Sequence, residues 1–207
     1  MRISEIDPTI LAHLEDFKNN DFAGNPRRLK FPGLGEISPT TIRYISVAAE
    51  IRTLFGSMGQ KSIVEIGAGY GGQCLILNKI GYFQHYTIYD LPKVQELIGS
   101  YLDANKINQV SYPKQISTPI SKYDLAISNY AFSELPRSIQ VGYLENVLIH
   151  SRNGYMIMNS GDINKTGRSA GKITLPELLS RIPNARVLPE IPRTGPDNYV
   201  LVWNESF

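Results

Sequence analysis

Ser62-Ile63-Val64-Glu65-Ile66-Gly67-Ala68-Gly69-Tyr70-Gly71-Gly72 is the stretch that decides the fold. A short apolar run ends at an acidic residue and a cluster of glycines, and an apolar helical pattern begins at Cys74. This order is typical of a buried strand, a tight turn and a helix. Glycines let the backbone turn sharply and leave no Cβ between the chain and a ligand, while a helix N-terminus presents free N–H groups. We therefore expect a ligand site at this turn.

Strands and helices alternate along the chain after the turn. Strands are predicted at residues 85–89, 109–112, 123–127 and 155–158, with Asn153-Gly154 as the turn into the last of these. Helices are predicted to open at Pro92, at Leu135 (to residue 149) and at Thr174. Such alternation is typical of a parallel sheet with helices on both faces. The final strands, 185–188 and 199–203, are joined by a loop too short for a crossover helix and should pair antiparallel. We expect an α/β, Rossmann-like, seven-stranded, mostly parallel sheet with a C-terminal antiparallel hairpin.

The first 58 residues precede this core. Apolar residues at helical spacing predict a helix over residues 6–17, and Ser38-Pro39 opens a second helix as N-cap and first-turn proline. The glycines and prolines of residues 19–37 predict a loop without regular structure. We expect one domain over residues 1–207, in which residues 1–58 form an N-terminal helical cap and loop and residues 60–207 form the cofactor-binding core.

Composition limits the classes of partner. The 21 basic and 19 acidic residues form no basic stripe, so no nucleic-acid partner is expected. No apolar run approaches the roughly 20 residues of a membrane span. A single cysteine and the lack of a signal peptide favour a cytoplasmic protein. Glu134 and Asp162 are too few ligands to predict a metal, and a homo-oligomer is left open.

One interpretation of the turn is a dinucleotide site. Gly67, Gly69 and Gly72 match G-x-G-x-x-G, and Asp90 follows about 20 positions later, where such sites place a ribose-binding acid. An NAD(P)-binding oxidoreductase would use this pattern. Against it stand the acidic Glu65 before the glycines, the lack of a hydride-transfer constellation and the terminal hairpin.

The same residues resemble class I S-adenosylmethionine-dependent methyltransferases more closely. Residues 65–71 match the acid-x-Gly-x-Gly-x-Gly motif of that class. Asp90 matches the acid that ends its second strand, and residues 123–129 match the region of its fourth strand. A narrower resemblance, to a bacterial family of sugar O-methyltransferases, rests on residues 24–26, 33–44, 65–72, 89–92 and 129–134. These resemblances imply S-adenosyl-L-methionine as cofactor and a small, sugar-like acceptor methylated on oxygen. A catalytically silent domain that binds cofactor and a partner protein is the remaining alternative.

Ligands of an open parallel sheet bind at the carboxyl ends of its strands. Together with the resemblance, this rule selects the candidate site residues. The cofactor-binding candidates are Glu65, Gly67, Ala68, Gly69, Tyr70, Gly71, Asp90, Leu91, Ser128 and Asn129. The acceptor-binding candidates are Tyr130, Arg43, Tyr44 and Asn159.

Two acidic residues in this set have alternative roles. A sugar hydroxyl is weakly acidic, so a base helps, and Glu134 supported by Ser133 is the catalytic candidate. Glu134 could instead cap the helix that follows it. Glu65 could brace the glycine loop by accepting backbone N–H bonds. His85 and His150 stand at the amino ends of strands and are expected at the opposite edge of the sheet.

Overall fold

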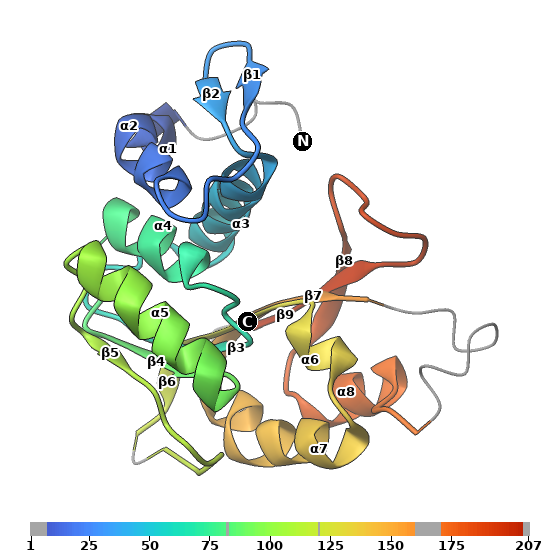
Figure 1. The fold of residues 1–207 in the computed structure, drawn as a ribbon. Coiled ribbons are helices and arrows are strands. Elements are labelled where there is room, and N and C mark those ends of the chain that lie inside the picture. Colours follow the sequence, from blue (N-terminus) through green and yellow to red (C-terminus); the bar gives the residue numbers. More distant parts are fainter. Residues whose placement is uncertain (1–7, 82, 120, 160–170, 205–207) are drawn as a thin grey trace.

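The central sheet is built around β3 (Ser62–Ile66), a strand that is buried from residue 63 onward. The computed structural model describes residues 8–81, 83–119, 121–159 and 171–204, and its seven-stranded sheet has the order β5-β4-β3-β6-β7-β9-β8 (Figure 1). The other strands are β4 (His85–Tyr89), β5 (Val110–Ser111), β6 (Tyr123–Asn129), β7 (Ser151–Met158), β8 (Arg186–Pro189) and β9 (Tyr199–Asn204). Strands β3 to β7 pair in parallel, whereas β9 is antiparallel to both β7 and β8. The predicted Rossmann-like sheet and its C-terminal hairpin are confirmed.

Two sets of helices cover the two faces of this sheet (Figure 1). One set comprises α3 (Pro39–Phe55), α4 (Gly72–Ile80) and α5 (Pro92–Ala104), and the other comprises α7 (Arg137–Asn146) and α8 (Leu175–Arg181). Successive residues of a strand point to opposite faces, so Ile63 packs with the first set and Val64 with the second. The short helix α6 (Ala131–Glu134) follows β6 directly and therefore lies at the carboxyl edge of the sheet.

The N-terminal segment differs from the sequence prediction in two places. The described part of the helix predicted for residues 6–17 forms two single turns, α1 (Pro8–Leu11) and α2 (Leu14–Phe17), followed by the 3₁₀ turn η2 (Lys18–Asp21). The N–H of His13 donates to the carbonyl of Ile10 at 3.0 Å, a tight turn that interrupts the helix. The predicted loop holds an antiparallel hairpin, β1 (Leu29–Phe31) and β2 (Gly35–Ile37). Its Pro32-Gly33 pair forms the hairpin turn, where we expected only loop.

The second N-terminal helix begins at the predicted N-cap. The hydroxyl of Ser38 accepts a hydrogen bond from the N–H of Thr41 at 3.1 Å, which confirms the N-cap. Ile45, Ala48 and Ile51 are buried in the core between α3 and the sheet. Helix α3 thus packs on one face of the sheet.

The boundary between α7 and β7 also differs from the prediction. The predicted helix 135–149 is divided into α7 and the 3₁₀ turn η3 (Leu148–His150), and β7 begins at Ser151. Asn153 and Gly154 therefore lie inside a strand and form no turn. A Cβ on Gly154 would lie 2.1 Å from ring atoms of Trp203, its partner on β9. The glycine is needed here because the indole ring packs directly over the backbone.

This contact gives a stability prediction. Gly154→Ala should lower the free energy of unfolding by about 1–3 kcal/mol or more, because the added methyl group overpacks a buried site. Urea denaturation followed by circular dichroism measures the change. The matched control is Gly142→Ala in α7, where the nearest atom would be 3.5 Å away. That variant should be neutral or more stable by up to about 1 kcal/mol, and equal effects of the two substitutions would contradict the packing argument.

Candidate active site

The carboxyl ends of β3, β4 and β6 meet around the glycine loop, residues 67–71. The N–H of Gly67 donates to the carbonyl of Tyr89 at 2.8 Å, which holds the loop beside Asp90. The hydroxyl of Ser128 donates to the carbonyl of Ile66 at 2.9 Å and accepts from the N–H of Phe132 at 3.0 Å. These bonds bring together the three segments that hold the predicted cofactor-binding residues: the glycine loop, the end of β4 and the end of β6. Ser128 itself is fully buried and bonded to backbone groups, so its side chain braces the site and is not open to a cofactor.

The glycine loop turns through left-handed backbone conformations. The φ angles of Gly67, Gly69 and Gly71 are 74°, 61° and 95°. A Cβ on Gly67 would lie 2.1 Å from the Cβ of Ala131, so the loop passes directly beside the start of α6. Ala68 is buried within the turn. Helix α4 begins immediately after the loop and leaves its first N–H groups without helical partners.

Two tyrosines and an asparagine pack against Tyr70 of this loop. The ring of Tyr70 makes edge contacts with Tyr101 at 5.3 Å and with Tyr44 at 6.0 Å between ring centroids. The amide of Asn20 donates to the hydroxyl of Tyr70 at 2.7 Å and accepts from that of Tyr101 at 2.7 Å. Tyr70 is therefore fixed by neighbours. Sequence reasoning missed Asn20 because nothing local distinguishes it from the polar residues around it.

Glu65 lies beneath the loop and has a different partner from the one we expected. Its side chain is 1% exposed, and its Oε2 accepts a hydrogen bond from the hydroxyl of Tyr86 at 2.8 Å. Burial raises the pKa of Glu65 to about 8 although this hydrogen bond opposes the shift, and the charge of Asp90 raises it further. The bond ties β3 to β4. Glu65 braces the strands through a tyrosine and is enclosed, away from any ligand.

Asp90 and Leu91 are accessible where β4 ends. One carboxylate oxygen of Asp90 accepts a hydrogen bond from the N–H of Leu91 at 2.8 Å, and the carboxylate is only partly buried. The side chain of Leu91 is 71% exposed. An acid and an open apolar side chain thus stand next to the glycine loop, where a ligand can reach both.

Asn129 carries a buried acceptor that has no donor. Its Nδ2 donates to Oε1 of the fully buried Gln73 at 3.4 Å. Its Oδ1 is enclosed and receives no hydrogen bond from the described residues. Leaving a buried polar atom unsatisfied costs about 1–3 kcal/mol, so such atoms in native proteins call for an explanation. A ligand that brings an N–H group to the carboxyl edge would provide one.

Ser133 and Glu134, the predicted catalytic pair, make hydrogen bonds to other groups of the protein. The hydroxyl of Ser133 donates to the carbonyl of Tyr130 at 2.6 Å and accepts from the N–H of Asn159 at 3.1 Å. Glu134 is exposed, and its Oε1 accepts a hydrogen bond from the side chain of Asn159 at 3.1 Å. These contacts join α6 to the end of β7. Ser133, Glu134, Asn159 and Tyr44 do not line the cavity described next.

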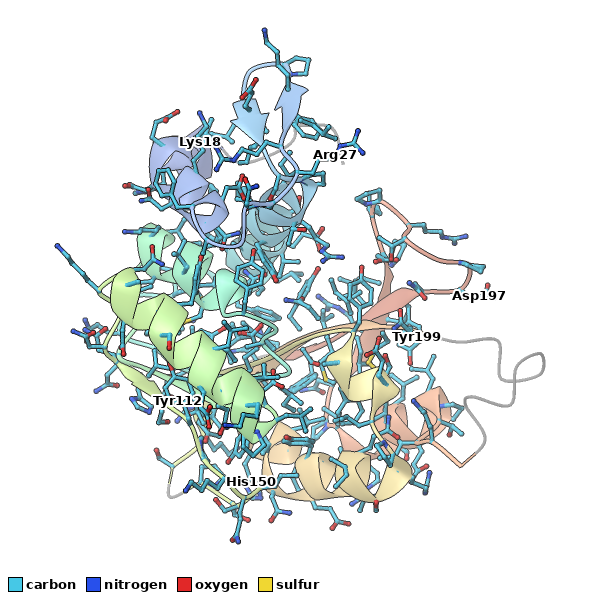
Figure 2. All side chains as sticks on the ribbon, in the orientation of Figure 1. Lys18, Arg27, Tyr112, His150, Asp197 and Tyr199 are labelled. Carbon is cyan, nitrogen blue, oxygen red and sulfur yellow. The ribbon has the colours of Figure 1, made fainter. Side chains whose placement is uncertain are left out.

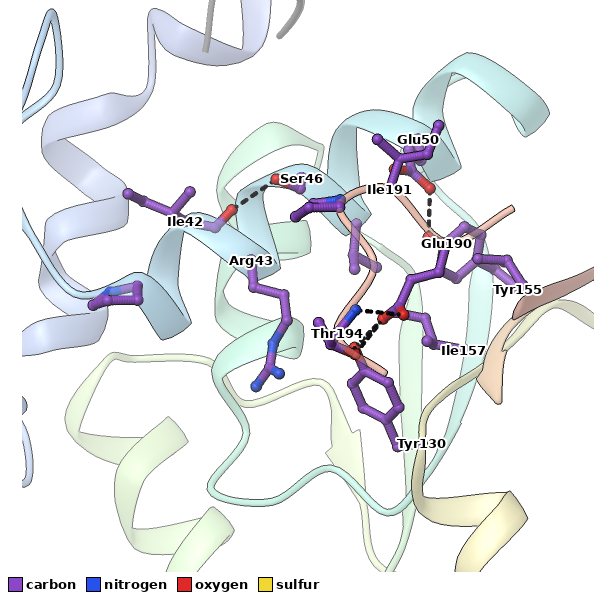
Figure 3. A pocket seen from close by; sticks show the side chains of 14 residues that line it. Ile42, Arg43, Ser46, Glu50, Tyr130, Tyr155, Ile157, Glu190, Ile191 and Thr194 are labelled. Atoms are coloured by element: carbon purple, nitrogen blue, oxygen red, sulfur yellow. Dashed lines mark hydrogen bonds between the residues drawn. The ribbon is translucent and has the colours of Figure 1, made fainter. Parts of the chain in front are cut away.

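A cavity of about 260 Å³ opens between α3, the end of β7 and the loop between β8 and β9, residues 190–198 (Figure 3). Two of the predicted acceptor-binding residues, Arg43 and Tyr130, line it, and the guanidinium of Arg43 lies 5.6 Å from the centre of the Tyr130 ring. Tyr130 has a φ of 71°, which costs free energy for a bulky residue. Strained residues of this kind concentrate at functional sites. The cavity also lies at the carboxyl edge, where ligands of such sheets bind.

Two carboxylates in the cavity were missed by sequence reasoning. Glu190 accepts hydrogen bonds from the hydroxyl of Tyr130 and from the N–H of Thr194, the latter at 2.9 Å. Burial acts to raise the pKa of Glu190, but these hydrogen bonds outweigh it and hold the pKa below its ordinary value. Glu50 accepts one from the hydroxyl of Tyr155 at 2.5 Å, and burial raises its pKa. No sequence signal marks either residue, because each stands in an ordinary helix or loop context.

The histidines lie away from this site, as predicted for His85 and His150. His85 begins β4 and contacts Ser111 at 2.9 Å, while His150 precedes β7 and lies below α7 in Figure 2. Asp162 lies outside the described residues. Within the described ranges, no three His, Cys, Asp or Glu side chains are grouped so that they could hold a metal ion.

No helix in the described part of the chain has the length and hydrophobicity needed to cross a membrane.

Comparisons with known proteins place the fold. The sequence matches no protein-family model and no curated protein. The methyltransferase domain of bacterial CtHen1-CN aligns with a TM-score of 0.59 at 16% identity, over 80% of this chain and 98% of that one. The mitomycin 7-O-methyltransferase MmcR aligns with a TM-score of 0.54 at 14% identity, over 79% of this chain and 54% of that one. A mutant of MtNAS in complex with S-adenosylmethionine aligns with a TM-score of 0.56 at 14% identity, over 80% of this chain and 63% of that one. The chain has the Rossmann-like fold of class I methyltransferases, and identities this low establish the fold alone.

The buried Glu65 predicts a pH-dependent stability. Its pKa is about 8 in the folded protein and ordinarily 4.5. Between these values the folded state holds a proton that the unfolded chain has lost, so stability falls as the pH rises. From pH 5 to pH 8 the free energy of unfolding should decline by up to about 1.4 kcal/mol per pH unit from this group. Urea denaturation at several pH values measures the slope.

Two variants test the assignment to Glu65. Glu65→Gln keeps an acceptor for Tyr86 but does not titrate, so its slope should be shallower than that of the wild type. Glu36→Gln removes an exposed carboxylate from β2 and should keep the wild-type slope. Parallel slopes for the wild type and Glu65→Gln would show that Glu65 is ionised in the folded protein.

Proposed function

We propose that the protein is an S-adenosylmethionine-dependent methyltransferase that methylates a hydroxyl group of a small, sugar-like acceptor. The observation that carries the cofactor proposal is the buried Oδ1 of Asn129, which receives no donor from the described residues beside the glycine loop. The ammonium group of the methionine moiety would supply that donor. The methyltransferases and the S-adenosylmethionine complex among the similar structures support the same cofactor.

The other accessible residues fit the rest of this molecule. Asp90 would accept hydrogen bonds from both ribose hydroxyls, and the exposed side chain of Leu91 would pack against the adenine ring. The glycine loop leaves room for the backbone to approach the ligand closely. When bound, the cofactor supplies a methyl group activated by a sulfonium. The protein then has to align the acceptor oxygen and exclude water.

The acceptor would occupy the cavity beside Tyr130. Its volume of about 260 Å³ is just below the common range of small-molecule sites, about 300–1,000 Å³, and suits a molecule of monosaccharide size. The acceptor hydroxyl must lose its proton as it is methylated. Tyr130 is placed to take that proton, because its own hydroxyl donates to Glu190 and can pass a proton on in the same step. This pair takes the role that the sequence suggests for Glu134.

The cofactor proposal is tested by calorimetric titration with S-adenosylhomocysteine. The wild-type protein should bind it, and Asp90→Ala should weaken binding at least about tenfold, because charge-assisted hydrogen bonds to the ribose are lost. Asp103→Ala removes an exposed carboxylate from α5 and should bind like the wild type.

A parallel titration with NADH separates the alternatives. Binding of NADH without any response to S-adenosylhomocysteine would overturn the proposal and identify a dinucleotide site. Equal affinities of the wild type and Asp90→Ala would exclude the ribose contact. Cofactor binding without methyl transfer to the true acceptor would indicate a silent binding domain.

A further inference from the structure

Thr194 contacts both side chains of the pair that is placed to take up a proton from the acceptor. Its hydroxyl donates to Oε1 of Glu190 at 2.8 Å, and its backbone N–H donates to Oε2 of the same carboxylate at 2.9 Å. The hydroxyl oxygens of Thr194 and Tyr130 lie 3.1 Å apart. Figure 3 shows the three side chains together at one wall of the cavity.

Both hydroxyl groups donate to the same carboxylate oxygen. Tyr130 and Thr194 each have one hydroxyl hydrogen, and their contacts direct both hydrogens to Oε1 of Glu190. The amide of Asn198 donates to the hydroxyl oxygen of Thr194 at 3.1 Å, so the hydrogen of this threonine is left to point at the carboxylate. The hydroxyl oxygen of Tyr130 keeps lone pairs that can accept a hydrogen bond from a molecule in the cavity, which Tyr130 lines.

Glu190 needs several donors because it is buried. It is 5% exposed, and burial favours the neutral form of a carboxyl group, whereas hydrogen bonds to the carboxylate favour the charged form. Burial acts to raise the pKa of Glu190, but bonds from the N–H of Thr194 and from the side chains of Tyr130, Thr194 and Asn198 hold it below its ordinary value. Thr194 supplies two of these bonds. Only the charged form can receive a proton.

Other ionisable groups face the same cavity. Arg43 and Glu50 line it from α3, and Tyr155 lines it from β7. Coulomb interactions join Glu190 to Glu50 and to Tyr155, and the amino terminus of the chain also acts on Glu50. Glu50 has a tyrosine partner of its own, because it accepts a hydrogen bond from the hydroxyl of Tyr155 at 2.5 Å. The two carboxylates can therefore be followed separately, Glu190 through Tyr130 and Glu50 through Tyr155.

We propose that Thr194 is a positioning residue for the proton transfer: its hydroxyl holds the unprotonated carboxylate of Glu190 against the hydroxyl of Tyr130. The new bond joins the acceptor oxygen to the methyl carbon, and the electron pair of the broken carbon–sulfur bond stays on sulfur. The proton of the acceptor passes to Tyr130 while the proton of Tyr130 passes to Oε1 of Glu190, so the carboxylate ends neutral. The proton transfer rests on the proposed function, whereas the alignment of the three side chains does not.

Tyrosine resonances test the positioning role. Protein labelled with carbon-13 at the ζ carbon of tyrosine is titrated from pH 7 to pH 3, and Tyr130→Phe and Tyr155→Phe assign the two reporter signals. Thr194→Val replaces the hydroxyl by a methyl group and keeps the backbone N–H. The step in the Tyr130 signal should move up by about one pH unit, or tenfold in the ionisation constant, because a hydrogen bond to the charged carboxylate is lost. A side chain that only stabilised the loop would leave this midpoint unchanged.

Two further threonine variants are the controls. Thr194→Ser restores the hydroxyl and should keep the wild-type midpoint. Thr118→Val removes another exposed hydroxyl, one that donates to Asn146 at 2.8 Å, and neither of these residues lines the cavity. It should also keep the wild-type midpoint. The amide spectrum recorded on each sample shows whether the variant is folded, and Thr194→Ala, which also lacks the hydroxyl, replaces Thr194→Val if that variant does not fold.

Each outcome decides the proposal. An unchanged midpoint in Thr194→Val, or an equal shift in Thr194→Ser or Thr118→Val, would overturn it. If acid unfolds the wild-type protein before its step, the wild-type midpoint lies below the pH of unfolding, and a step above that pH in Thr194→Val supports the proposal; its absence there overturns it. Neither cofactor nor acceptor is present in these titrations, so a failure to bind S-adenosylhomocysteine would count against the proposed function alone.

Discussion

The site depends on the absence of a side chain at Gly67. The chain turns there at a φ of 74°, with the Cβ of Ala131 only 2.1 Å from where a Cβ would be. This approach lets β3 end directly beside α6, and the bond from Gly67 to the carbonyl of Tyr89 fixes the end of β4 at the same point. Asp90 and Asn129 consequently lie at the same edge of the sheet, on either side of the end of β3, although they are 39 positions apart in the sequence. A larger residue at position 67 would separate these groups.

The N-terminal segment is part of this arrangement and not an appendage. The buried carboxylate of Asp21 accepts hydrogen bonds from the N–H and the hydroxyl of Ser38, at 2.6 and 2.7 Å. Asn20, the residue before it, bonds to Thr41 of α3, to Tyr70 of the glycine loop and to Tyr101 of α5. Two adjacent residues thus connect the start of α3 with the loop. The order of the glycine loop and the position of α3 are therefore coupled.

Local patterns predicted most of the fold, including the glycine loop and the strand ends that lie beside it. The run 62–72, the N-cap at Ser38 and the short connection before β9 each have a signal within a few residues. The cavity has no such signal, because its contacts join distant parts of the chain. Tyr155 and Glu50 are 105 residues apart, and Tyr130 and Glu190 are 60 apart. The turn predicted at Asn153-Gly154 is wrong for the same reason, since only the ring of Trp203 across the sheet explains the glycine.

The position of β9 between β7 and β8 has a consequence for how the protein can diverge. Since β9 is antiparallel to both neighbours, β8 runs in the direction of β7 and delivers residues 190–198 back to the carboxyl edge. The cavity is thereby walled by a helix near one terminus and a loop near the other, while the glycine loop belongs to the middle of the chain. Because α3 is coupled to the glycine loop through Asn20, the loop of residues 190–198 is the wall in which substitutions can reshape the cavity and leave residues 62–72 undisturbed. Selectivity in the cavity can therefore change through this loop while the architecture of the glycine loop is kept.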